Sequence, residues 1–197
     1  MASYLFVPGG QRTAADFDQL RALLEAQGHP TRALTLSDPA RASLADHLGQ
    51  VTAALAGSPP EGLILAGHSY GGFVSVGAAA QAPQHLAELA MVDAPLPHGG
   101  QSLWGVFRAA GLDAAAFGVP PWPLFTTPLA FDQGVLDRLP KSYIRCRHSE
   151  FQELTRGLPA WIASRPLSHA WRCQELDTGH YPMLENPGEL ARLLQPR

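Results

Sequence analysis

The chain has 197 residues, of which 46% are hydrophobic and 16% charged, values typical of one globular domain with a sizeable core. Its formal net charge of −3 and its pI near 6.2 give no basic surface for nucleic acid, and no stretch reaches the roughly 18 consecutive apolar residues of a membrane span. The N-terminus, MASYLFVPGG, lacks the basic segment of a signal peptide. We therefore expect a cytoplasmic protein that binds neither nucleic acid nor membrane.

Short apolar runs alternate with longer helical patterns along the chain, as in successive βαβ units with a mostly parallel sheet. Strands are predicted at residues 4–7, 31–36, 63–66, 89–92, 143–146 and 171–176. Helices are predicted at residues 17–27, 44–56, 71–82 and 188–194, with a turn at 57–60. The predicted fold class is therefore α/β, with about six strands flanked by helices.

The pattern breaks between residues 94 and 140, where proline, glycine and aromatic residues are dense. This segment is too short for a core of its own, and its aromatic side chains need an apolar surface to cover. We expect a lid between the fourth and fifth strands of a single domain spanning 1–197, rather than a disordered proline-rich loop. The aromatic residues expected to line the substrate pocket are Trp104, Phe107, Trp122 and Phe125.

The stretch Gly67-His68-Ser69-Tyr70-Gly71 matches the pattern G-x-S-x-G. The pattern alone is a weak signal in a chain with 19 glycines. Its position is more specific, because a sharp turn from a buried strand into a helix exposes a serine above the sheet. The N-terminus of the following helix also favours developing negative charge. Ser69 is therefore the predicted nucleophile, rather than an ordinary turn or N-cap serine.

A serine hydroxyl needs a general base, and His180 is placed to supply it. It follows the sixth predicted strand and precedes the last helix, so it can point toward Ser69 across the strand ends. An oxyanion hole needs two backbone N–H donors, one of them from the residue after the nucleophile. Tyr70 is predicted to supply that donor, and Gly10 or Gln11, after the first strand, is predicted to supply the second.

Four segments together resemble the α/β-hydrolase family over nearly the whole chain: VPGG, AGHSYGG, MVDAPLPHGGQSL and DTGHYPMLENP. The resemblance is narrower to a small branch that contains plant-type methylesterases, hydroxynitrile lyases and methylketone synthases. It implies a Ser-His-acid hydrolase of esters or thioesters. Many members carry histidine where this chain has Pro8. Lyase members carry lysine directly after the catalytic histidine, whereas this chain has Tyr181 there and Lys141 is its only lysine. Cyanohydrin cleavage is therefore disfavoured.

The acid of the triad is the point at which the chain departs from this branch. The resemblance places the acid after the fifth strand, at a position aligned with Ser149, which cannot ionise. The neighbouring Glu150 could serve if the loop shifts by one residue, and Asp93, at the end of the fourth strand, is the other candidate. Asp177 is too close to His180 in sequence to be preferred. A chain with no functional acid is the third alternative.

The predicted function is hydrolysis of a small or medium apolar ester, or a thioester, through an acyl-enzyme on Ser69. This chemistry requires no metal or organic cofactor, and the expected partner is a small-molecule ester substrate. The alternative is a non-catalytic or weakly catalytic binding protein of the same fold with a degraded triad, because function resides in the site and not in the fold. The oligomeric state is open, with a homodimer as one candidate.

Overall fold

A six-stranded sheet forms the centre of the computed structural model, which describes residues 1–58, 62–165 and 168–196. The strand order is β2-β1-β3-β4-β5-β6, and every neighbouring pair is parallel. This arrangement confirms the predicted fold class. The strands are β1 (Ser3–Val7), β2 (Thr31–Ala33), β3 (Leu63–His68), β4 (Glu88–Val92), β5 (Lys141–Cys146) and β6 (Trp171–Leu176).

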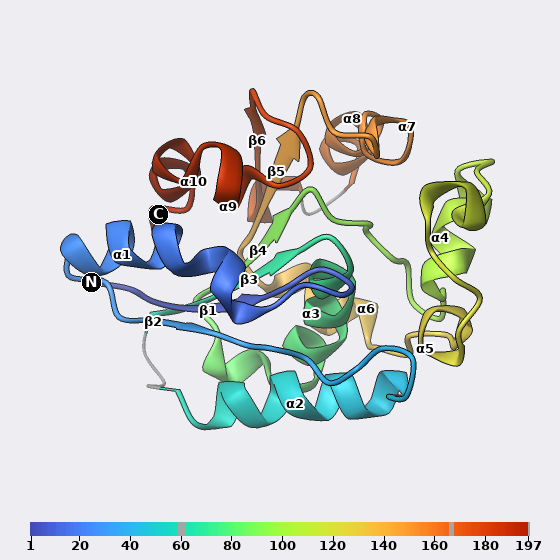
Figure 1. Cartoon of the computed structure of the whole chain (residues 1–197), viewed down its shortest axis with the longest axis horizontal. Helices are drawn as coiled ribbons and strands as arrows, with labels where there is room; N and C mark the ends of the chain where they lie inside the picture. The colour runs from blue at the N-terminus through green and yellow to red at the C-terminus, as the bar shows by residue number, and fades with distance from the viewer. Residues whose placement is uncertain (59–61, 166–167, 197) are drawn as a thin grey trace.

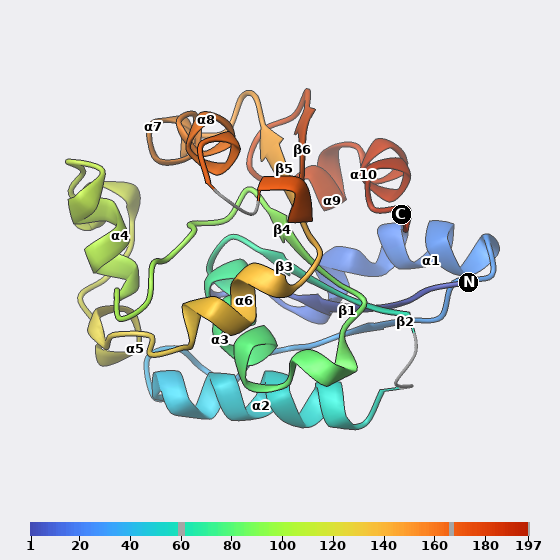
Figure 2. The same cartoon turned by 180° about the vertical axis from the view of Figure 1, so that it is seen from behind.

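Helices cover both faces of the sheet, and Figures 1 and 2 show α1 and α10 side by side on one face and α3 and α6 on the other. The α-helices are α1 (Asp18–Ala26), α2 (Leu44–Ala56), α3 (Tyr70–Gln81), α4 (Leu103–Ala109), α5 (Pro123–Thr126), α6 (Gln133–Arg138), α7 (Gln152–Thr155), α8 (Leu158–Ala163), α9 (Pro182–Glu185) and α10 (Pro187–Leu193). The short 3-10 helices are η1 (Ala14–Phe17), η2 (Pro83–His85), η3 (Ala114–Phe117) and η4 (Ser168–Ala170).

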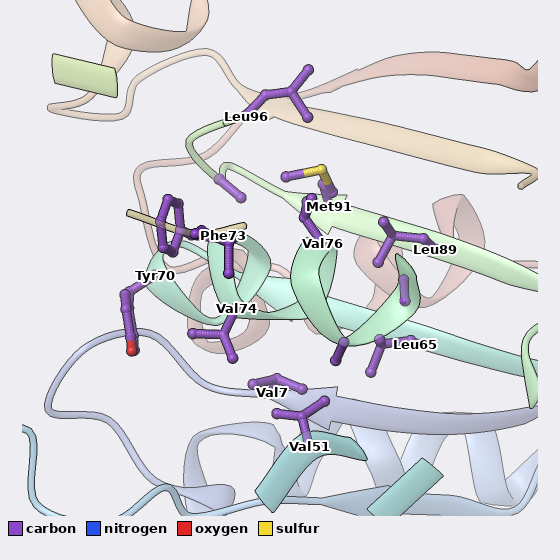
Figure 3. Close-up of a cluster of buried hydrophobic side chains, with 14 of the residues drawn as sticks. Val7, Val51, Leu65, Tyr70, Phe73, Val74, Val76, Leu89, Met91 and Leu96 are labelled. Atoms are coloured by element: carbon purple, nitrogen blue, oxygen red, sulfur yellow. The ribbon is translucent and has the colours of Figure 1, made fainter. Parts of the chain in front are cut away.

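Two hydrophobic cores lie on opposite faces of the sheet, because successive side chains of a strand point to opposite sides. On β3, Leu65 belongs to the core with α2 and α3, whereas Ile64 and Ala66 belong to the core with α1 and α10. Figure 3 shows Leu65 together with Phe73 and other side chains of α3 in the first of these cores. The central strands β3 and β4 are buried along their whole length. The sheet is therefore a rigid base for residues at its carboxyl edge.

The segment 94–140 forms helices rather than a structureless loop. It contains α4, η3, α5 and α6, and it packs buried side chains such as Phe107, Leu124 and Leu129 against the core on the α2 and α3 side. Figures 1 and 2 show α4 and α5 at the same end of the molecule, beyond the sheet. Apolar and aromatic side chains of this segment therefore pack against the core of the domain.

Several boundaries differ from the sequence-based expectation. The second strand was expected at 31–36, but β2 ends at Ala33, where its pairing with β1 ends. The short helices α7 and α8 were not predicted, since each is under two turns long and has no clear period. The turn expected at 57–60 lies partly outside the described residues. No helix in the described ranges has both the length and the apolar character needed to cross a membrane.

Candidate active site

Ser69 occupies the turn between β3 and α3 in a strained backbone conformation. Its φ of 53° and ψ of −127° lie in a region that non-glycine residues rarely adopt. The flanking glycines make the turn possible. A Cβ at Gly67 would lie 2.5 Å from Cα of Gly72, and a Cβ at Gly71 would lie 2.3 Å from the carbonyl oxygen of Pro8. The G-x-S-x-G pattern is thus a steric requirement of the close strand-to-helix crossing.

His180 lies in the loop between β6 and α9, and its imidazole is bound to a carboxylate. The Nδ1 atom of His180 lies 2.7 Å from Oδ2 of Asp93. The His180 side chain is 4% exposed and the Asp93 side chain 0% exposed. A hydrogen bond of this length between two buried groups fixes the ring orientation and leaves Nε2 available for another partner.

Asp93 follows the last residue of β4 and has a positive φ of 44°. Its Oδ1 accepts a hydrogen bond of 3.2 Å from the backbone N–H of Cys146 at the end of β5. Both carboxylate oxygens therefore have partners, which is the condition under which a buried charge is tolerated. The buried thiol of Cys146 experiences the same carboxylate: desolvation, followed by the charge of Asp93, raises its pKa to about 12.

The other carboxylates considered from the sequence are not in contact with the imidazole. Glu150 is exposed and lines the cavity beside His180. Asp177 is directed elsewhere, with its Oδ1 2.7 Å from Nε2 of His148. Ser149, at the position aligned with the usual acid, is buried, and its Oγ lies 3.5 Å from Nδ1 of His180. Within the described residues, the only carboxylate within hydrogen-bond distance of His180 is that of Asp93.

The three residues expected to form an oxyanion hole lie around one cavity with Ser69. Gly10 and Gln11 come from the loop after β1, and Gln11 has a positive φ of 60°. Tyr70 begins α3, where the first N–H groups of a helix have no acceptor within the helix. No backbone hydrogen bond among the described residues uses the N–H of Gly10, Gln11 or Tyr70 as donor. These donors are therefore available to a negatively charged oxygen in the cavity.

The cavity has a volume of about 250 Å³ and an aromatic lining. Phe107 and Phe125, which were expected to contact substrate, line it. Trp104 and Trp122 are not among its lining residues. The Trp104 indole donates a hydrogen bond of 3.2 Å to the carbonyl of Pro120, and Trp122 stacks on Phe125 with ring centroids 5.9 Å apart. The two tryptophans thus support the wall from behind, which corrects the expectation of direct lining.

Phe151 is a wall residue that the sequence did not single out. It precedes α7 and packs its ring 4.4 Å from the His180 ring, measured between centroids. It also stacks on Phe117 of the 94–140 segment, at 5.7 Å. The segment around α7 has no clear sequence period. The only sequence signal for this role was the position of Phe151 directly after Glu150, a candidate for the triad acid. The cavity is therefore lined by segments that precede and follow β5 in the chain.

Two further side chains hold the backbone around His180, and neither was predicted. His68, on β3, has its Nε2 2.7 Å from the carbonyl oxygen of His180, so Nε2 carries the proton and donates. The Glu185 carboxylate accepts hydrogen bonds from the N–H of Gly179, at 2.7 Å, and of Tyr181, at 3.3 Å. The loop is thus fixed on both sides of the imidazole. The sequence signal was the histidine before the nucleophile and the acid five residues after His180.

A third unpredicted contact holds Tyr70. The Nε2 of His47, on α2, donates to the carbonyl of Ser37 at 2.9 Å, so its Nδ1 accepts from the Tyr70 hydroxyl at 2.9 Å. Burial lowers the pKa of His47, which favours the neutral imidazole that this arrangement requires. Figure 3 labels Tyr70 at the margin of the cluster built on Val7, Phe73 and Val74. The residue after the nucleophile is therefore fixed by packing and by its hydroxyl.

Among the described residues, no group of three or more His, Cys, Asp or Glu side chains is placed to hold a metal ion. His180 and Asp93 are instead paired with each other, and Asp93 also accepts from a backbone N–H. The arrangement can hold a proton on the imidazole of His180, on the cavity that the half-buried Ser69 also lines, and stabilise a negatively charged oxygen there.

The fold is similar to those of several solved structures. The chain is similar to polyneuridine aldehyde esterase, with 18% identity, a TM-score of 0.75 and coverage of 98% of each chain. It is similar to tomato methylketone synthase I, with 16% identity, a TM-score of 0.77 and coverage of 98% of this chain and 96% of that one. It is also similar to an extracellular alpha/beta-hydrolase from a Paenibacillus species, with 18% identity, a TM-score of 0.76 and coverage of 98% of each chain.

None of the curated proteins compared with the chain matches it in sequence. At identities below 25%, the structural likenesses establish the fold alone. The model of the alpha/beta hydrolase family matches residues 4–193, which is nearly the whole chain. The chain therefore belongs to the alpha/beta hydrolase family.

Proposed function

We propose that this protein is a serine hydrolase that cleaves a small or medium apolar carboxylic ester, or a thioester, through an acyl-enzyme on Ser69. The observation that carries this proposal is the pairing of His180 Nδ1 with Asp93 Oδ2 at 2.7 Å, beside a cavity that Ser69 also lines. Asp93 takes the role of the triad acid in this proposal, and Glu150 does not. The acid orients the imidazole and stabilises its protonated form.

In the first half of the reaction, the Ser69 oxygen attacks the carbonyl carbon of the ester while Nε2 of His180 takes the hydroxyl proton. The N–H of Tyr70 and that of Gly10 or Gln11 donate to the oxyanion. The bond from the carbonyl carbon to the leaving oxygen, or to sulfur in a thioester, then breaks. His180 gives its proton to that leaving atom, and the alcohol or thiol departs.

In the second half, a water molecule attacks the acyl-enzyme and gives a proton to His180. The bond between the acyl carbon and the Ser69 oxygen breaks, and His180 returns the proton to that oxygen. The carboxylic acid is released and the free enzyme is restored. Each half uses the same proton acceptor and the same oxyanion donors, which accounts for the rigid hold on the His180 loop by His68 and Glu185.

The segment 94–140 serves, in this proposal, as the lid of a single-domain hydrolase. It contributes Phe107, Phe117 and Phe125 to the cavity wall. An apolar wall with a few polar groups is typical of small-molecule sites. The volume of about 250 Å³ fits a small or medium substrate better than a long acyl chain. The tryptophans behind the wall stiffen this segment without meeting the substrate.

The test is hydrolysis of p-nitrophenyl acetate and butyrate by the wild type and by Ser69→Ala, together with labelling by an organophosphonate. We expect turnover by the wild type, one label located at Ser69 by mass spectrometry, and loss of both in Ser69→Ala. Equal rates for the two proteins and no label would overturn the nucleophile assignment. The alternative, a binding protein with a degraded triad, would then account better for the aromatic cavity.

A further inference from the structure

The side chains with a full charge that line the cavity are acidic, and the imidazole of His180 is the one basic group beside them in the described part of the chain. Asp93 and Glu150 line it, and no lysine or arginine is among its lining residues in the described part of the chain. Asp93 is fully engaged by His180 and by the N–H of Cys146. Glu150 is exposed at the cavity and has no hydrogen-bond or ion-pair partner among the described residues. An exposed glutamate carries a negative charge at neutral pH, so one uncompensated charge borders the cavity.

Aromatic rings surround the same space. The rings among the lining residues are those of Tyr70, Phe107, Phe117, Phe125, Phe151 and Tyr181. Phe151 directly follows Glu150 in the chain, and it contacts the rings of Phe117 and Phe107. The faces of aromatic rings attract cations, and quaternary ammonium groups are recognised by such rings. The carboxylate and the aromatic wall therefore favour the same kind of ligand.

Arg12, which contacts a ring of the cavity wall, does not cancel this preference. The Arg12 guanidinium lies over the Tyr181 ring, 5.1 Å from its centroid, but Arg12 is not a lining residue. Its charge is already paired with Asp16 through two hydrogen bonds, at 2.8 and 2.7 Å. An anionic substrate would therefore meet Glu150 with no compensating cation in the cavity wall.

We infer that Glu150 is a specificity-determining residue and that, among small esters with an apolar acyl part, the site prefers those whose alcohol part bears a cationic ammonium group. This inference rests on the proposed function, because it concerns the substrate of that same site. Glu150 attracts the cation at the cavity border, and the neighbouring rings replace part of its hydration. The same charge disfavours esters that carry a free carboxylate.

Because Glu150 is exposed to solvent, its contribution to the preference for a cation is limited. A solvent-exposed charge pair changes binding by about two- to fivefold, and contact with aromatic faces adds a similar factor. We therefore expect the preference for a cation over a neutral molecule of the same shape to fall about threefold in Glu150→Gln. In Glu150→Lys, where attraction becomes repulsion, it should fall by about tenfold or more.

The experiment compares butyrylcholine with its neutral isostere, 3,3-dimethylbutyl butyrate. The measured quantity is the ratio of the two kcat/KM values, for the wild type, Glu150→Gln and Glu150→Lys. The matched control is Glu153→Gln, which removes the same charge from an exposed residue of α7 that does not line the cavity. We expect the ratio to fall in both Glu150 variants and to keep its wild-type value in Glu153→Gln.

A second measurement separates this inference from the proposed function. Binding of choline and of 3,3-dimethylbutan-1-ol is followed by titration calorimetry on the same four proteins, and it needs no hydrolysis. If p-nitrophenyl butyrate is not hydrolysed, the proposed function fails and the binding ratio alone decides the inference. Tighter binding of choline that weakens in Glu150→Gln supports it. Equal binding of the two molecules, or a ratio unchanged in Glu150→Lys, overturns it.

Discussion

Asp93, at the end of β4, and His180, in the loop after β6, are 87 positions apart in the chain, yet Oδ2 of Asp93 lies 2.7 Å from Nδ1 of His180. The parallel sheet brings them together, because all its strands end at the same edge. Both side chains are buried, so little bulk water competes with the contact between them. This pair is the basis of the first two predictions.

Replacing Asp93 by asparagine should lower kcat for p-nitrophenyl butyrate by up to about 10⁴-fold, with a residual rate above that of Ser69→Ala. The amide can still accept from the N–H of Cys146, but it cannot stabilise the imidazolium ion. Steady-state kinetics on the purified variant measure the loss. Asp177→Asn is the control, because its carboxylate pairs with the exposed His148 and not with His180 in the described part of the chain. An equal fall in both variants would contradict the assignment of the acid.

Position 149 allows a second test of the triad acid, in which the carboxylate is moved from Asp93 to the position of Ser149. Its Oγ is 3.5 Å from the same Nδ1, so a carboxylate built on the same Cβ can come within hydrogen-bond distance. In the Asp93→Asn background, Ser149→Asp should recover kcat at least about tenfold. The matched control is Ser149→Asn in that background, which has the same shape without the charge. Equal rates for the two double variants would show that the Ser149 position cannot supply the acid.

Glu185 is predicted to act as a positioning residue through the backbone on both sides of His180. Glu185→Ala removes the acceptor for the N–H of Gly179 and of Tyr181, and it should lower kcat about tenfold with little change in KM. Glu185→Gln keeps one acceptor oxygen and should recover part of the loss. Stopped-flow acylation rates measure the catalytic effect of each variant, and thermal melts measure its stability. A fall in Tm that fully accounts for the lost activity would contradict a positioning role.

His68 should make folding stability depend on pH below neutrality. Burial, and after it the nearby His180, lowers the pKa of His68 well below its ordinary value of 6.5, and its Nδ1 has no partner among the described residues. Below pH 6.5 the unfolded chain therefore binds a proton that the folded chain does not. Stability is retained above pH 6.5 and falls as the pH decreases, by at most about 1.4 kcal/mol per pH unit from this residue.

Urea unfolding at pH 7.5, 6.5 and 5.5 measures this dependence. His68→Gln keeps an N–H donor for the His180 carbonyl but does not titrate, so its stability should change less over this range. His47 and His98 have pKa values lowered in the same direction by burial and leave a residual slope in the variant. A His68→Gln slope as steep as that of the wild type would contradict the prediction.

The amino-acid sequence by itself determined the parts of this protein that depend on short-range patterns. Apolar runs and helical periods located the six strands and the main helices, because each is encoded within a few residues. The Ser69 turn could be recognised for the same reason: Gly67 and Gly71 are required within the turn itself, where a Cβ would meet backbone. His180 could be placed because it follows a strand directly, at the edge where Ser69 also lies.

Only the tertiary structure decided which carboxylate meets the imidazole and which aromatic rings line the cavity. Asp93, Glu150 and Asp177 all follow strands that end at one edge. The sequence disfavoured Asp177 but did not decide between Asp93 and Glu150, since that choice depends on the direction of each loop. Asp93 has a backbone conformation with positive φ, and its carboxylate accepts a hydrogen bond from the N–H of Cys146. Together these two features hold the carboxylate at the imidazole. In the same way, Phe107 lines the cavity and Trp104 lies behind it, because packing between segments distant in the chain sets the orientation of each ring.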